Sequence, residues 1–99
     1  MDMQRLMQQA NVMQRQLKKI EEELEATVYT GSNNGVEVQI NGKHEVVKVS
    51  IPADMLSKDN QEMIQDLIQL AANQATKEAA EEREAKMGAM TQGINFPGL

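Results

Sequence analysis

The strongest constraint on the fold is a heptad repeat that runs through residues 3–24. Apolar side chains recur there at alternating spacings of three and four positions: Met3, Leu6, Ala10, Met13, Leu17, Ile20 and Leu24. This spacing places them on one face of a helix, as in the seam through which a helix packs on another helix. We therefore predict a helix over residues 1–25, a rod of about 36 Å.

The stretch VEVQINGKHEVVKVSI, residues 36–51, predicts a β-hairpin. Val36, Val38 and Ile40 alternate with polar residues, and the Asn41-Gly42 dipeptide is preferred in two-residue type I′ turns. Such a turn pairs Ile40 with Lys43 and Val38 with Glu45, and continues the apolar face at Val47, Val49 and Ile51. Residues 26–30 have the composition of a strand and residues 31–35 that of a loop. We expect a three-stranded antiparallel sheet within residues 26–51.

A second long helix is predicted over residues 59–87. Asp59, with Glu62 three positions later, is typical of a capping box. Gly88 is a candidate C-cap, and residues 88–99 form a tail punctuated by Gly and Pro. The chain is thus predicted to be one α+β domain, residues 1–99, with the order α-β-β-β-α.

Both predicted helices are too long for a compact domain of this size. The second would measure about 42 Å, whereas a compact domain of about 100 residues has a radius of gyration near 13 Å. An overhanging apolar seam invites association, so we expect an elongated homodimer with projecting helical arms. The candidates for its interface lie on the first helix and the hairpin: Met3, Leu6, Ala10, Met13, Val36, Val38 and Ile40.

Composition excludes several classes of function. The chain has no Cys, which excludes disulfides, thiolate metal sites and a cysteine nucleophile. Its one histidine, His44, is interpreted as a surface residue, and no grouping of nucleophile, base and orienting residue is visible. We expect a chain that is not an enzyme, with no catalytic residue, metal, cofactor or small-molecule substrate. No apolar run reaches the roughly 20 residues that cross a membrane, and no signal peptide is evident, so we predict a cytoplasmic protein without membrane contact.

The charge is divided unevenly along the chain. The formal net charge is −5, yet residues 1–20 carry four cations against Asp2, and the run EEELE at 21–25 follows them. Arg15, Lys18 and Lys19 share one helical face, opposite the seam. That face is either an ordinary solvated surface or, doubled in a dimer, a pair of patches that contact the phosphates of a duplex.

Four segments together resemble a known family: MQRLMQQANVMQRQLKKIEEELE, VEVQINGKHEVVKVSI, DNQEMIQDLIQLAANQATKEA and the tail KMGAMTQGINFPGL. Over essentially its whole length the chain resembles the YbaB/EbfC family of bacterial nucleoid-associated proteins. The resemblance implies a tweezer-like homodimer that binds double-stranded DNA and influences nucleoid organisation or gene expression. It places the DNA-binding candidates on the two long helices, at Arg15, Lys18, Lys19, Lys77, Arg83 and Lys86. Lys43, His44 and Lys48 near the hairpin turn form a secondary patch.

Two functions remain open from the sequence. The first is a nucleoid-associated protein that binds duplex DNA. The alternative is a protein-interaction module whose arms clasp a recombination or replication protein, with incidental DNA affinity. The acidic net charge of −5 favours the alternative, because proteins that bind nucleic acid usually have a basic domain.

Overall fold

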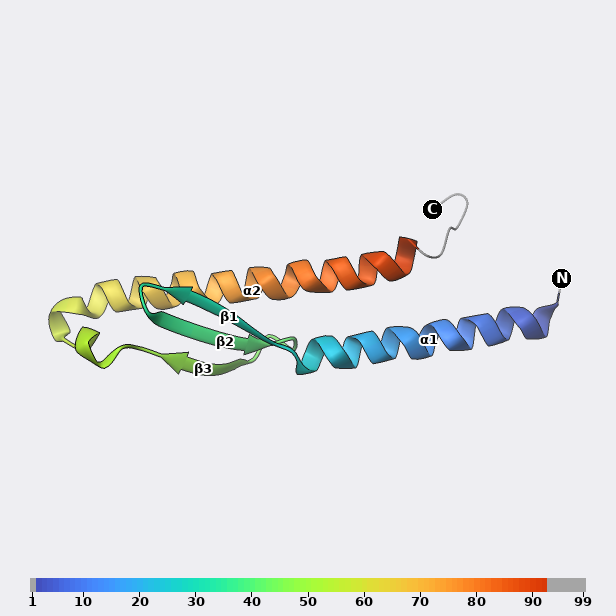
Figure 1. Cartoon of the computed structure of the whole chain (residues 1–99), viewed down its shortest axis with the longest axis horizontal. Helices are drawn as coiled ribbons and strands as arrows, with labels where there is room; N and C mark the ends of the chain where they lie inside the picture. The colour runs from blue at the N-terminus through green and yellow to red at the C-terminus, as the bar shows by residue number, and fades with distance from the viewer. Residues whose placement is uncertain (1, 93–99) are drawn as a thin grey trace.

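The computed structural model describes residues 2–92, and its element order confirms the predicted α-β-β-β-α fold. The elements are α1 Met3–Ala26, β1 Val28–Asn33, β2 Val36–Asn41, β3 Val46–Ser50, two short 3-10 turns (Ala53–Met55 and Lys58–Asn60) and α2 Gln61–Gln92. The strands form one antiparallel sheet in the order β1-β2-β3. Figure 1 shows α2 lying along the sheet, while α1 leaves one end of the sheet and runs beside the later part of α2.

The protomer is elongated. Its principal extents are 71 × 24 × 13 Å, and its radius of gyration is 19.9 Å, against about 13 Å for a compact chain of this length. The elongation arises because α1 and the C-terminal part of α2 extend beyond the sheet (Figure 1). Both helices therefore overhang the sheet, as their predicted lengths required.

The ends of the helices are set by local side chains. The Asp2 carboxylate accepts a hydrogen bond from the Gln4 amide at 3.1 Å and caps α1. Before α2, the Ser57 hydroxyl accepts from the Asp59 amide at 3.3 Å and caps the 3-10 turn Lys58–Asn60, so Asp59, the predicted cap, lies inside this turn. The helix then passes through Gly88, which we predicted as its C-cap. Gly88 lacks the positive φ with which a glycine ends a helix, and α2 continues to Gln92; residues 93–99 of the predicted tail lie outside the described residues.

The predicted type I′ turn occurs at a different Asn-Gly pair. Asn34 (φ 50°) and Gly35 (φ 88°) both have positive φ and join β1 to β2 in two residues, as that turn type requires. The connection after Asn41 is longer, because its side-chain Oδ1 accepts hydrogen bonds from the amides of Lys43 and Glu45 at 2.9 and 3.1 Å. Val38 therefore pairs with Val49 rather than with Glu45, and a bulge follows at Gln39/Ile40.

The core lies between α2 and one face of the sheet. Its buried side chains are Tyr29, Val38 and Ile40 from the strands and Ala71, Ala75 and Ala79 from α2. The small residues permit a very close approach: a Cβ on Gly31 of β1 would lie 1.7 Å from the Ala71 carbonyl oxygen. Helix and sheet are thus in backbone contact at this point.

Three hairpin side chains that were candidates for the dimer interface are buried within the protomer. Val36, Val38 and Ile40 are 0%, 1% and 3% exposed, because α2 covers their face of the sheet. They present no surface to a second chain in this arrangement. Exposed apolar side chains of the sheet gather instead on the β3 edge, where Val46, Val47 and Val49 are each about half exposed; Val28 of β1 is exposed to a similar degree.

Candidate nucleic-acid interface

The candidate interface begins with how α1 is held. Its last turn is fixed against the sheet: Leu24 is buried, and a Cβ on Gly42 would meet the Leu24 carbonyl oxygen at 1.8 Å. Toward the N-terminus the apolar seam becomes exposed, and Met3 and Leu6 are 70% and 43% accessible. The helix is therefore a projecting arm, anchored at its C-terminal end.

The three predicted cations of α1 lie on the exposed face of this arm. Arg15, Lys18 and Lys19 are all exposed, and they occupy the side of the helix opposite the apolar seam. Within residues 2–92 none of them forms an ion pair; the Arg15 Nε donates only to the Asn11 carbonyl oxygen, at 3.4 Å. Their charges are free to meet an anion from solvent.

The predicted cations of α2 are in a different electrostatic state. Lys77 lies 3.9 Å from a carboxylate oxygen of Glu81, and Lys86 lies 3.2 Å from one of Glu82. Arg83 crosses to the other helix, where its Nη2 donates to both carboxylate oxygens of Glu21 at 2.5 Å. All three α2 cations are therefore compensated by carboxylates of the chain itself, unlike those of α1.

The junction of α1, α2 and β1 contains a further polar residue that the sequence did not single out. The Tyr29 hydroxyl is buried and makes no hydrogen bond of standard geometry among the described residues. Burial raises the pKa of Tyr29, and the nearby Glu82 carboxylate adds to this effect. The pKa of Glu82 is lowered, first by its interaction with the Tyr29 hydroxyl and second by Lys86.

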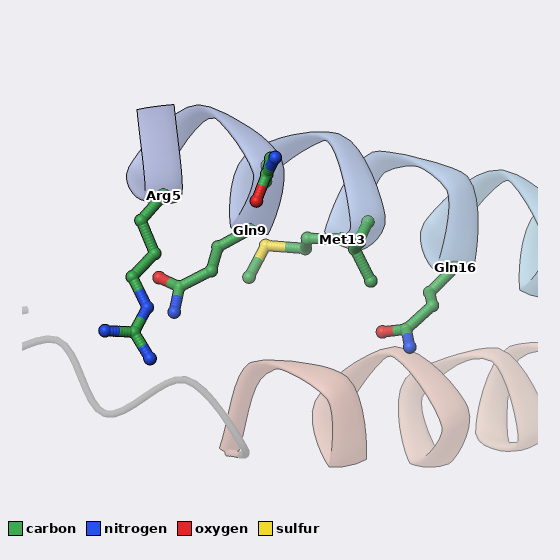
Figure 2. Close-up of a pocket in the computed structure, with 6 residues that line it drawn as sticks. Arg5, Gln9, Met13 and Gln16 are labelled. Carbon is green, nitrogen blue, oxygen red and sulfur yellow. The ribbon is translucent and has the colours of Figure 1, made fainter. Parts of the chain in front are cut away.

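A shallow hollow of about 420 Å³ lies on the free part of α1, lined by Arg5, Gln8, Gln9, Val12, Met13 and Gln16 of that helix. Figure 2 shows Arg5, Gln9, Met13 and Gln16 around this hollow, with Gln16 extending toward α2. Spacing by three or four residues places them on one side of the helix. Arg5 therefore belongs to this hollow, whereas Arg15 and Lys18 line a separate surface hollow with Asn11 and Gln14.

The secondary patch at the β2–β3 connection is mixed in charge. Lys43 shares a hollow with Glu22, Glu25 and Glu45, so carboxylates offset its charge. His44 is exposed and has a positive φ of 65°. This region is therefore a weaker candidate for phosphate contact than the outer face of α1.

Two further searches concern residues 2–92 alone. No cluster of three or more His, Asp or Glu side chains suited to a metal ion occurs in this part of the chain. None of the described helices is both long and apolar enough to span a membrane.

The fold and the cationic arm define a class: a small, elongated α+β protein with an exposed cationic face on a projecting helix. Within that class, the model of the YbaB/EbfC DNA-binding family matches residues 1–94. The chain therefore belongs to the YbaB/EbfC DNA-binding family, which is a family of DNA-binding proteins rather than of enzymes.

Individual relatives agree with this membership. A nucleoid-associated protein of Clostridium novyi is 43% identical over 101 residues, covering all of this chain and 89% of the relative. One from Desulfotalea psychrophila is 40% identical over 101 residues, covering all of this chain and 95% of the relative. Among solved structures, an uncharacterized protein from Helicobacter pylori superimposes with a TM-score of 0.75 at 28% identity, covering 92% of this chain and 98% of its own.

Proposed function

We propose that this chain is a nucleoid-associated protein that binds duplex DNA as a homodimer, through the outer face of α1. The observation that carries the proposal is the set of three exposed cations on the projecting arm, Arg15, Lys18 and Lys19, none of which forms an ion pair within residues 2–92. Family membership supplies DNA as the polyanion. Contacts of this kind are made to phosphates, so the binding is expected to tolerate sequence changes and to weaken with salt.

The dimer is supported by apolar surface that the protomer leaves uncovered. Met3 and Leu6 on the arm, and Val46 and Val49 on the β3 edge, are exposed. Exposed apolar side chains grouped in this way are typical of surfaces that associate. With Val36, Val38 and Ile40 inside the core, the α1 seam remains as the candidate interface, together with the β3 edge. A second copy doubles the cationic face to six charges on two arms.

A salt titration tests the proposal. Fluorescence anisotropy with two unrelated duplexes is measured between about 50 and 200 mM salt for the parent chain and for Arg15→Ala/Lys18→Ala/Lys19→Ala. If all six cations of a dimer contact phosphates, the slope of log K against log salt falls by about 5 units in the variant. Affinity for both duplexes is expected to fall together, because phosphates carry no sequence information.

The charge-matched comparison is Lys58→Ala/Lys77→Ala/Lys86→Ala. It removes the same three charges and includes two residues of α2 that are already paired with Glu81 and Glu82. We expect a smaller loss of affinity and of salt dependence than in the α1 variant. Equal losses in the two variants would show that net charge, rather than the α1 face, governs binding, and no binding by the parent chain would refute DNA binding itself.

The acidic surface of α2 favours a second function, that of a protein-interaction module. Glu62, Asp66, Glu78 and Glu84 are exposed along this helix, and a surface of that sign repels a duplex but suits a basic protein. A module that clasps a recombination or replication protein would use this surface. Partners that remain bound after nuclease treatment of a lysate would favour this second function, and partners that are lost would favour the first.

A further inference from the structure

We propose that Glu21 and Arg83 are positioning residues that fix the direction of the α1 arm relative to α2, and that Arg83 is not itself a phosphate contact. The residues are 62 positions apart and belong to the two long helices. The inference rests on the proposed function only for its consequence in DNA binding. The geometry of the arm can be measured without DNA.

The ion pair lies near the anchored C-terminal end of α1, where a small rotation of the helix displaces its N-terminus by a large distance. On the C-terminal side of Glu21, the helix is anchored by Leu24 against Gly42. On the N-terminal side of Glu21, the seam becomes progressively exposed toward Met3. Met3 lies about 27 Å along the helix from Glu21, so a rotation of about 10° at the junction moves the tip by about 5 Å.

The pairing geometry suits a positioning role. One guanidinium nitrogen of Arg83 contacts both carboxylate oxygens of Glu21, which restrains the carboxylate more than a single contact does. This hydrogen bond raises the pKa of Arg83, so the guanidinium remains charged. The two side chains are still 42% and 35% exposed, and pairs as exposed as this add little to global stability. The role expected of the pair is orientation of the arm.

The acidic residues of the run EEELE at 21–25 have different environments. Glu21 is joined to Arg83, whereas Glu22 and Glu23 are exposed and form no ion pair among the described residues. Glu22 is therefore a matched control for Glu21: the same residue type, one position away, with the same change in charge when replaced by Gln.

The arm is tested by distance measurement. The chain has no Cys, so spin labels can be placed at Gln4→Cys on the arm and Ala80→Cys on α2. Doubly labelled chains are diluted with unlabelled chains so that only distances within a protomer are read. We expect a narrow distribution in the parent and in Glu22→Gln, and a broad one in Glu21→Gln and in Arg83→Gln. The charge swap Glu21→Arg/Arg83→Glu should narrow the distance distribution again.

DNA affinity gives a second test, because loss of charge and loss of positioning are expected to change the affinity in opposite directions. Glu21→Gln and Glu22→Gln each remove one negative charge near the cationic face, which by electrostatics alone should tighten DNA binding. If Glu21 positions the arm, Glu21→Gln instead weakens binding by roughly two- to ten-fold, and the charge swap restores it. Glu22→Gln binds at least as tightly as the parent.

Three outcomes would overturn the inference or separate it from the proposed function. Unchanged distance distributions in both single variants, with helicity retained by circular dichroism, would refute the positioning role. Tighter DNA binding by Glu21→Gln, as in its control, would refute the link to DNA. A parent that binds no duplex would refute the proposed function, while the distance measurement would still decide on the arm.

Discussion

At the scale of single residues, the most unusual environment is that of Tyr29. Its hydroxyl is buried in the junction between sheet and helices and makes no hydrogen bond of standard geometry with the part of the chain that the structure describes. Ionising the phenol there would cost free energy, first because the anion would be buried and second because the Glu82 carboxylate is close. The folded protein therefore favours the neutral phenol.

The stability of the fold should respond to alkali through this residue. The pKa of Tyr29 is raised above its ordinary value of 10.0 in the folded state, so its contribution is complete below pH 10.0. It is lost as the pH rises toward the folded-state pKa, because the unfolded chain releases its proton first. Tyr29→Phe should remove this part of the dependence, as measured by urea unfolding between about pH 8 and 11. Parallel curves for the two proteins would contradict the assignment.

At the scale of elements, α2 and β1 are in direct backbone contact. The backbone of Gly31 approaches Ala71 and Ala75 so closely that an added Cβ would overlap the Ala71 carbonyl at 1.7 Å. We expect Gly31→Ala to displace α2 and to destabilise the protein by about 2 kcal/mol or more. Chemical denaturation measures the loss.

The control for that substitution is Gly88→Ala. Gly88 lies within α2, and a Cβ there meets nothing within 4 Å. The same change should stabilise the helix by about 0.5–1 kcal/mol. Destabilisation at both positions would mean that the loss at Gly31 does not arise from close packing against α2.

The elements also show how far the sequence determined the fold. The heptad over residues 3–24 and the alternation from Val36 correctly predicted a long helix and a hairpin. The local signal could not distinguish the Asn34-Gly35 pair from Asn41-Gly42, because the choice depends on the side-chain hydrogen bonds of Asn41. The observed partner of Val38 lies four residues from the predicted one, and this even shift keeps Val49 on the same face as Val38, as predicted. Beyond the bulge the shift is odd, because Ile40 pairs with Val46 rather than with Lys43, and alternation alone does not reveal a bulge.

The candidate site was less accessible to sequence reasoning than the fold. The outer position of Arg15, Lys18 and Lys19 followed from helical periodicity alone. The partner of Arg83 did not, because Glu21 is 62 residues away and only the packing of two helices brings them together. Pairing of this kind distinguishes α2 from α1, although both carry three candidate cations.

At the scale of the whole molecule, an extent of 71 Å and an exposed seam make self-association the central question. We expect sedimentation equilibrium to give twice the 11.0 kDa chain mass at micromolar concentration. Leu6→Glu/Met13→Glu should shift the equilibrium toward monomer, because the charges fall on the apolar seam of the arm.

The matched control is Gln4→Glu/Gln8→Glu, which adds the same two charges to the same helix away from the seam. It should leave the mass of the assembly unchanged. A single-chain mass for the parent would contradict the homodimer, and equal dissociation by both variants would contradict the α1 seam as its interface.

The separation of charge between α1 and the rest of the chain affects how the protein would approach a duplex. With a net charge of −5, the chain and DNA repel each other at long range, and attraction begins only when an arm comes within roughly a Debye length, about 10 Å at 0.1 M salt. Adding salt would screen the repulsion that slows the encounter and would also weaken the bound complex. Collision frequency and residence time would then respond to ionic strength in opposite directions, so the bound lifetime would be most sensitive to the cations of α1.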